Sequence, residues 1–140
     1  MKSFLSWIIV FILAFGGLSV FTHISLLANP TRIVIAFDDS FYMKDVWPRI
    51  AVELETLVNR RYTEYFVISN KEKISREWET EGVIDRFLQT RLFIGEYAVA
   101  DLVNSQKYPE LKQADRILVF TSGQNTSGLA ADKRATIFNL

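Results

Sequence analysis

The sequence contains no cysteine, a single histidine and only three prolines, and neither sign of charge is in excess. Without cysteine the chain can form no disulfide, no thiolate metal site and no cysteine nucleophile. The one histidine, His23, lies at the end of an apolar N-terminal run, so the rest of the chain cannot build a histidine-based triad or zinc site. The 16 basic and 16 acidic residues form no block of one sign, which argues against nucleic acid as a partner.

The longest stretch without charge lies between Lys2 and Arg32, and residues 4–21 are apolar apart from two serines and two glycines. A helix needs about 20 apolar residues to cross the hydrocarbon core of a bilayer. We therefore predict that residues 1–29 form a transmembrane anchor, which ends before Pro30 because proline disfavours helix in the preceding residue. A cleaved signal peptide is the alternative, although its apolar region would exceed the usual upper limit of about 15 residues.

Both interpretations place residues 30–140 across the membrane. Lys2 and the terminal amine favour a cytoplasmic N-terminus, because positive charge is retained on that side. We expect a single-pass membrane protein of a bacterial inner membrane, with the domain on the periplasmic side.

Apolar runs alternate with helical patterns in the remaining chain. Three continuous runs, rich in β-branched residues, lie at 33–37, 65–68 and 117–120, and residues 136–140 are a fourth candidate. Such runs are typical of strands buried on both faces of a parallel sheet. The alternation predicts an α/β domain over residues 30–140, with a mostly parallel open sheet flanked by helices.

The helical segments are expected between these strands. Residues 44–62 place their apolar side chains on one stripe, with Asp45 as a plausible N-cap. Asn70 is expected to cap a short polar helix, and a further helix is expected at residues 96–105.

Polar side chains follow two of the predicted strands. Asp38, Asp39 and Ser40 come after the first, and the turn Thr121-Ser122-Gly123 follows the run at 117–120. Ligands of open parallel sheets bind at the carboxyl ends of the strands, which meet at one edge. Carboxylate and hydroxyl oxygens gathered there suit a hard divalent cation such as magnesium. The simpler alternatives are that Asp39 caps the next helix and that Thr121-Ser122-Gly123 is only a turn from the strand into a loop.

The segment from Ile33 to Met43, with the amphipathic helix that follows, resembles the von Willebrand factor A family. That family places Asp-x-Ser-x-Ser after its first strand, in a metal-ion-dependent adhesion site. Asp38 matches the aspartate and Ser40 the first serine, whereas Tyr42 stands in place of the second. The resemblance covers roughly residues 31–140 and implies a shortened form of that fold.

The resemblance also implies a set of metal ligands, namely Asp38, Ser40, Thr90 and Ser122. Thr90 is the candidate for the threonine of the intervening loop, and Ser122 replaces the aspartate of the family's Thr-Asp-Gly-like turn. The phenol of Tyr42 is bulkier than a serine hydroxyl, and Ser122 carries no charge. We therefore expect weak magnesium binding or none, because hard cations need several well-placed oxygens.

The resemblance further implies that a protein partner docks at this edge. If the metal is lost, docking rests on Phe41 and Tyr42 beside Thr121, since aromatic residues dominate interface hot spots. We thus expect a membrane-tethered protein–protein interaction module and no enzymatic activity. The family usually carries a sixth strand and a final helix, whereas this chain reaches only about a fifth strand. The alternative is therefore an accessory subunit of a larger membrane complex, in which a partner covers the exposed edge of the sheet.

A second resemblance is weaker. Haloacid-dehalogenase-like phosphatases place a nucleophilic aspartate and a threonine at positions that Asp38 and Thr121 match. However, Ser40 stands where that family has its acid/base aspartate, and no late acidic pair follows. Phosphoryl transfer would then lack its means of stabilising charge.

Overall fold

The computed structural model describes most of the 140-residue chain. The described residues are 2–40, 43–58, 60–90, 102–122 and 132–139. They form two compact units, one of residues 1–30 and one of residues 31–140, which are treated separately below.

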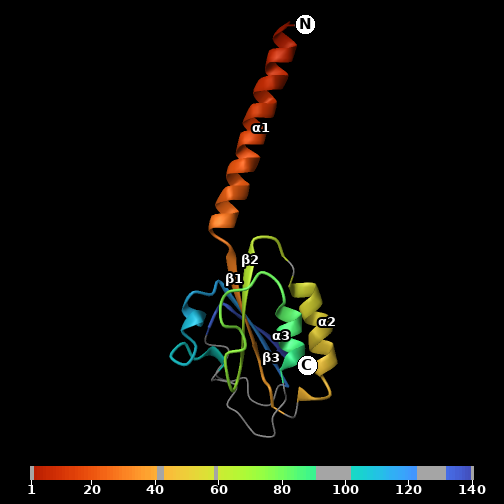
Figure 1. Ribbon diagram of the computed structural model, residues 1–140, viewed down its shortest axis with the longest axis vertical. Coiled ribbons are helices and arrows are strands. Elements are labelled where there is room, and N and C mark those ends of the chain that lie inside the picture. Colours follow the sequence, from red (N-terminus) through yellow and green to blue (C-terminus); the bar gives the residue numbers. More distant parts are fainter. Residues whose placement is uncertain (1, 41–42, 59, 91–101, 123–131, 140) are drawn as a thin grey trace. The chain divides into compact units, whose positions relative to one another are not determined.

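The first unit consists of the helix α1, Lys2–Ala28 (Figure 1). Its side chains from Phe4 to Ala28 are exposed on every side and are mostly apolar. At 1.5 Å per residue this span is about 37 Å long, against a hydrocarbon core of about 30 Å. The helix is therefore long and apolar enough to span a membrane, as the sequence predicts. It ends at Ala28, two residues before Pro30.

The second unit is built on one sheet of four parallel strands. The strands are β1 (Thr31–Phe37), β2 (Thr63–Ser69), β3 (Arg116–Thr121) and β4 (Ala135–Asn139), in the order β2-β1-β3-β4. The prediction of a parallel α/β sheet is confirmed, and each predicted strand is present.

Helical segments cover both faces of this sheet (Figure 1). The helices α2 (Trp47–Leu57) and α3 (Val83–Gln89) lie on one face. Residues 102–114, which include the 3-10 helix η3 (Pro109–Lys112), lie on the other. The sheet is thus the middle layer of three.

Strand β1 contributes side chains to both core layers. Ile33, Ile35 and Phe37 pack with α2 and α3, whereas Val34 and Ala36 pack with the segment at 102–114. Side chains of a strand alternate between its faces. An unbroken apolar run is therefore what a strand buried on both faces requires.

The helix α2 is shorter than predicted, and Asp45 is not its N-cap. The cap position is Val46, without a side-chain hydrogen bond, and Pro48 lies in the first turn. Two successive backbone bonds, from Met43 N to Ser40 O and from Val46 N to Met43 O, lead the chain into the helix. Backbone turns thus replace side-chain capping, and neither Asp45 nor Asp39 caps this helix.

The short helix predicted after Asn70 is wrong. Residues 72–79 instead run beside β2, with antiparallel bridges between Ile68 and Lys73 and between Tyr65 and Glu79. The hydroxyl of Ser75 accepts the backbone N–H of Val67 at 3.1 Å. An unpaired sheet edge would leave polar backbone groups unsatisfied, and this segment satisfies them.

Two further differences concern helices. The helix α3, which the sequence analysis did not predict, begins after Gly82, whose positive φ of 80° suits glycine. The helix predicted at 96–105 lies mostly outside the described residues. Of its described part, residues 102–105, only residues 102–103 are helical, and they are 3-10.

The anchor prediction is tested by extracting membranes with alkaline carbonate. The full chain should stay in the membrane pellet at its complete mass, since α1 can span the bilayer. A protein that is released into the supernatant and has lost its N-terminal segment would show a cleaved signal peptide instead.

Core packing on α2 gives a matched pair of variants. Leu54 is fully buried, whereas Val52 is 62% exposed on the same helix. Leu54→Ala should lower the free energy of unfolding of the full chain in detergent by about 2–5 kcal/mol, and Val52→Ala by no more than about 0.5 kcal/mol. Urea unfolding measures both, and equal effects would contradict the assigned faces of α2.

Candidate functional site

The carboxyl ends of β1, β2 and β3 meet at one edge of the sheet because the three strands are parallel neighbours. Phe37 pairs with Ser69 of β2 and with Phe120 of β3. The backbone N–H of Asp38 donates to the carbonyl of Phe120 at 2.9 Å, which extends the ladder by one residue. Asp38 and Thr121 therefore lie on the same edge, as the sequence predicts.

Besides Ser69, whose hydroxyl bonds to the backbone of Glu72, five polar side chains are buried where these strands end, each no more than 5% exposed. We call this group the carboxyl-end cluster, and it consists of Asp38, Asp39, Ser40, Asn70 and Thr121. Three members follow β1, Asn70 follows β2, and Thr121 is the last residue of β3. The topology of the sheet, rather than closeness in sequence, brings them together.

Asp38 ties the ends of β1 and β2 to each other. Its Oδ1 accepts the backbone N–H of Ser40 at 3.0 Å and the side-chain amide of Asn70 at 2.7 Å. The first bond forms an Asx turn, which redirects the chain as it leaves the strand. Asp38 therefore has a structural role in this arrangement.

Two residues of the segment at 102–114 fix the backbone at the end of β2. The hydroxyl of Tyr108 donates to the carbonyl of Ser69 at 2.6 Å, and the ammonium of Lys107 donates to the carbonyl of Asn70. These contacts hold the Asn70 backbone in place, so that its side chain can reach Asp38.

Five side-chain oxygens of the other four members of the cluster have no hydrogen-bond partner among the described residues. Among the described residues, no hydrogen-bond partner meets either carboxylate oxygen of Asp39, the hydroxyls of Ser40 and Thr121, or the amide oxygen of Asn70. A buried polar atom without a partner costs about 1–3 kcal/mol, and each such atom in a folded protein calls for an explanation. All of these atoms can accept a bond from a donor or a cation.

Burial raises the pKa of the Asp39 carboxyl above its ordinary value. The neighbouring negative charge of Asp38 acts in the same direction. Longer polar contacts of the carboxyl with the Ser69 side chain and with its own backbone N–H, together with the charge of Lys71, act in the opposite direction without overcoming burial, and neither contact has the geometry of a full hydrogen bond. The ionised form of Asp39 is thus disfavoured in the folded protein, and a cation beside it would reverse this effect.

The donor chemistry of the cluster fits a hard cation. Asp39, Ser40, Asn70 and Thr121 offer only oxygen ligands, which magnesium and calcium prefer. Within the described ranges, however, no three acidic, histidine or cysteine side chains gather around one point. So little negative charge is unfavourable for tight binding, and the expectation of weak magnesium binding or none stays a prediction.

Only some of the residues predicted as metal ligands lie at the carboxyl-end edge. Ser40 belongs to the cluster with a free hydroxyl, and Ser122 is half-buried directly after β3. Thr90 does not join them, because its hydroxyl donates to the carbonyl of Arg86 at 3.0 Å where α3 ends. Phe41 and Tyr42, the predicted partner anchors, lie outside the described residues.

Thr90 instead lines a separate open hollow of about 410 Å³. The charged side chains around it are Glu72, Lys73, Arg76 and Arg86. Three of these four are cationic, which is unfavourable for a metal ion.

Sequence analysis places Asp39 at this edge but gives helix capping as its simpler role, which the structure does not bear out. It misses Asn70, which it assigns to the cap of a helix that does not form. The signal for Asn70 was present, since it directly follows an apolar strand, which is the criterion that selected Asp38.

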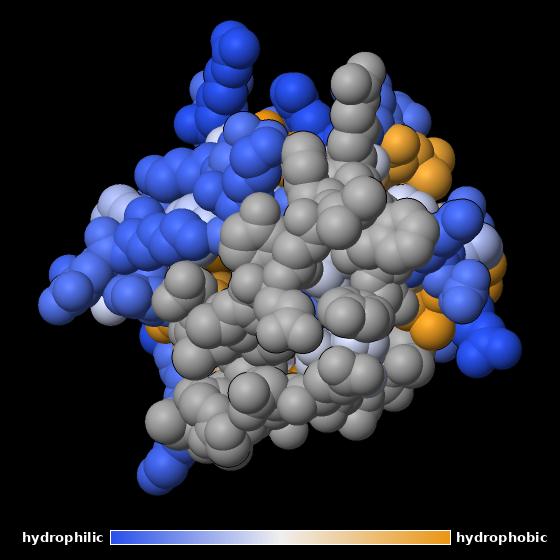
Figure 2. All heavy atoms as spheres, turned by 90° about the horizontal axis from the view of Figure 1, so that it is seen from below, coloured by the Kyte–Doolittle hydropathy of each residue, from blue (hydrophilic) through white to orange (hydrophobic). Residues whose placement is uncertain are grey.

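The described surface at this end of the domain is mostly hydrophilic around its rim (Figure 2). Hydrophobic side chains form small, separate patches there. The described part of the rim therefore favours a polar contact.

No protein-family model, no curated protein and no solved structure matches this chain. The resemblance to the von Willebrand factor A family therefore remains a prediction.

The raised pKa of Asp39 predicts a pH-dependent stability. A carboxyl whose pKa is higher in the folded than in the unfolded state contributes its stability at low pH and loses it as pH rises through the folded pKa. Asp39→Asn cannot ionise, so it should be more stable than wild type at pH 7, with the difference shrinking toward the unfolded pKa of about 3.9.

Urea unfolding of the full chain in detergent without divalent cations measures this difference. Asp45→Asn, at an exposed position, serves as the control and should show no such pH-dependent gain. A stability difference for Asp39→Asn that stays constant with pH would contradict the burial of an unpaired Asp39.

Proposed function

We propose that this chain is a membrane-tethered binding module that docks a protein partner at the carboxyl-end edge of its sheet. The unpaired oxygens of the carboxyl-end cluster carry the proposal. In folded proteins such atoms are satisfied by an ordered water or ion or are kept for a function. We place the domain on the periplasmic side of a bacterial inner membrane, following the charge at the N-terminus.

A divalent cation such as magnesium is the first candidate to satisfy the cluster. Asp39 and Ser40 would hold it, since their side-chain oxygens have no hydrogen-bond partner among the described residues, while Asp38 maintains the turn that positions them. The bound cation would supply positive charge at the edge, where a carboxylate of the partner can complete its coordination.

The same geometry argues against catalysis. A phosphatase mechanism would need Asp38 as nucleophile, yet its Oδ1 already accepts two hydrogen bonds. No histidine or cysteine lies beyond residue 29, so a nucleophile activated by an imidazole or a thiolate nucleophile is absent from the domain sequence. The cluster provides hydrogen-bond acceptors for binding, but Ser40 stands where a phosphatase would need its acid/base aspartate.

The cation part of the proposal is tested by thermal unfolding of the full chain in detergent with increasing Mg²⁺. Ligand at ten times the dissociation constant should stabilise the wild type by about 1.4 kcal/mol, and Asp39→Asn should remove this gain. Asp45→Asn should keep it. A wild type that does not respond to Mg²⁺ would exclude the cation and leave metal-free docking.

Docking itself is tested by a photo-crosslinking residue at position 122 in cells. Position 122 should give a discrete crosslinked product, which Phe41→Ala combined with Tyr42→Ala removes, because aromatic anchors dominate such contacts. Position 52, exposed on α2, is the control and should give no product. Equal crosslinking from both positions, or none from either, would contradict docking at this edge.

A further inference from the structure

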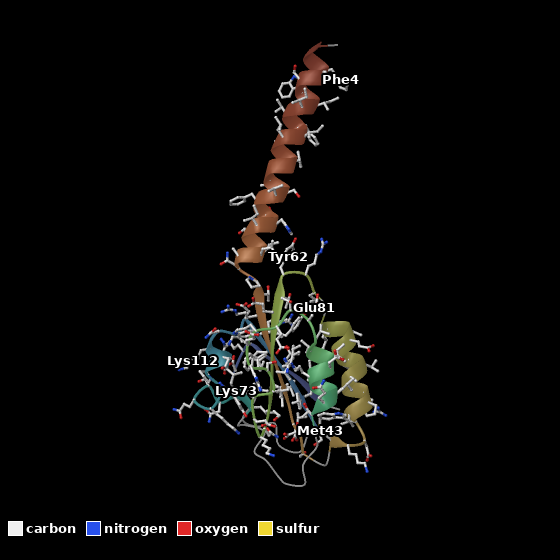
Figure 3. All side chains as sticks on the ribbon, in the orientation of Figure 1. Phe4, Met43, Tyr62, Lys73, Glu81 and Lys112 are labelled. Atoms are coloured by element: carbon white, nitrogen blue, oxygen red, sulfur yellow. The ribbon has the colours of Figure 1, made fainter. Side chains whose placement is uncertain are left out.

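The opposite end of the α/β domain carries a different set of side chains. Tyr62 and Glu81 lie at this end, and Met43 lies at the end of the carboxyl-end cluster (Figure 3). Each strand begins at this amino-terminal edge. Thr31 pairs with Thr63 in the first register position of β1 and β2.

Exposed basic residues gather at this edge without acidic partners. Arg60 and Arg61 precede β2, Arg116 begins β3, and Lys133 lies just before β4. None of the four forms an ion pair within the described part of the chain.

The acidic groups nearby offset this charge only in part. Glu64 is paired with Arg32 at 3.1 Å, and Asp132 is paired with Arg134 at 2.7 Å. Asp115, Glu81 and Asp85 also have no ion-pair partner among the described residues, and Asp85 shares a hollow with Val58 and Glu81. The positive charge is therefore concentrated in the adjacent pair Arg60-Arg61 and is not a general excess along the edge.

The turn Arg60-Arg61-Tyr62 is held firmly against the start of β1. Tyr62 has a φ of 57°, a left-handed conformation that is rare for a bulky residue. Its carbonyl accepts the N–H of Thr31 at 2.8 Å, and the N–H of Arg60 donates to the Tyr65 hydroxyl at 3.2 Å. Such strain persists only where the surroundings enforce it, often at functional positions.

The turn is bonded to the strand that follows the anchor directly in sequence. Only Asn29 and Pro30 separate Ala28, the last residue of α1, from Thr31, the first residue of β1, whose N–H donates to the carbonyl of Tyr62. A helix about 37 Å long exceeds the hydrocarbon core of about 30 Å, which places its end among the headgroups.

We propose that the turn Arg60-Arg61-Tyr62, with Arg116 and Lys133, binds the phosphates of anionic phospholipid headgroups. Guanidinium groups pair with phosphate oxygens in a bidentate manner, which suits the two adjacent arginines. This contact holds the domain to the lipid surface by its amino-terminal edge. It rests on α1 spanning the membrane and is independent of the partner at the other end.

The absence of cysteine allows single-cysteine labelling of the full chain in lipid nanodiscs. A fluorophore at Thr80→Cys, beside Glu81, reports on the amino-terminal edge, and one at Gln89→Cys, at the far end of α3, is the reference. Discs contain phosphatidylcholine with a nitroxide on its headgroup, either alone or mixed with phosphatidylglycerol. Quenching at position 80 should rise with the anionic lipid and fall with salt, while position 89 should not respond.

Arg60→Gln with Arg61→Gln is the decisive variant. Each basic residue near an anionic surface strengthens lipid binding by about 1 kcal/mol, or about fivefold. Loss of both arginines should therefore lower the ratio of lipid-bound to unbound domain about 25-fold. Arg49→Gln with Arg76→Gln, two exposed arginines away from this edge, should leave quenching unchanged. Quenching that ignores lipid charge, or that both variants reduce equally, would overturn the proposal, as would a chain that does not enter discs.

Discussion

The placement of β1 between two parallel neighbours is the constraint on which the domain depends. Its five core side chains fill both layers, and its register with β2 and β3 aligns the ends of all three strands. A slip of one residue would exchange the two faces and separate Asp38 from Asn70. The hydrophobic packing of one strand therefore fixes both the fold and the polar cluster at its tip.

The parts of the fold that follow from burial could be predicted from sequence. The continuous apolar run at 33–37 requires a strand covered on both faces, and α1 is mostly apolar and carries no acidic or basic residue after Lys2 except His23. The parts that depend on a neighbour could not. The polar segment at 72–79 has a composition that suits a solvated helix, but the free edge of β2 makes an extended course more favourable.

The candidate site was predictable to the same degree. Topology alone places Asp38, Ser40 and Thr121 together, because parallel strands end at one edge. The roles of the two aspartates could not be assigned without coordinates. Asp38 is occupied by Ser40 and Asn70, which leaves Asp39 as the buried carboxylate with free oxygens. Thr90 was chosen by analogy with a loop, and its hydroxyl is used to end α3.

The central claim is that the converging strands bury Asp39 without a hydrogen-bond partner among the described residues, and that a group outside the fold satisfies it. The most direct measurement is the carboxyl ¹³C titration of Asp39 in labelled full-length protein, assigned with Asp39→Asn. The account predicts a pKa above the ordinary aspartate value without divalent cations, and a lower pKa when Mg²⁺ is bound. An ordinary or lowered pKa in the cation-free protein would contradict it.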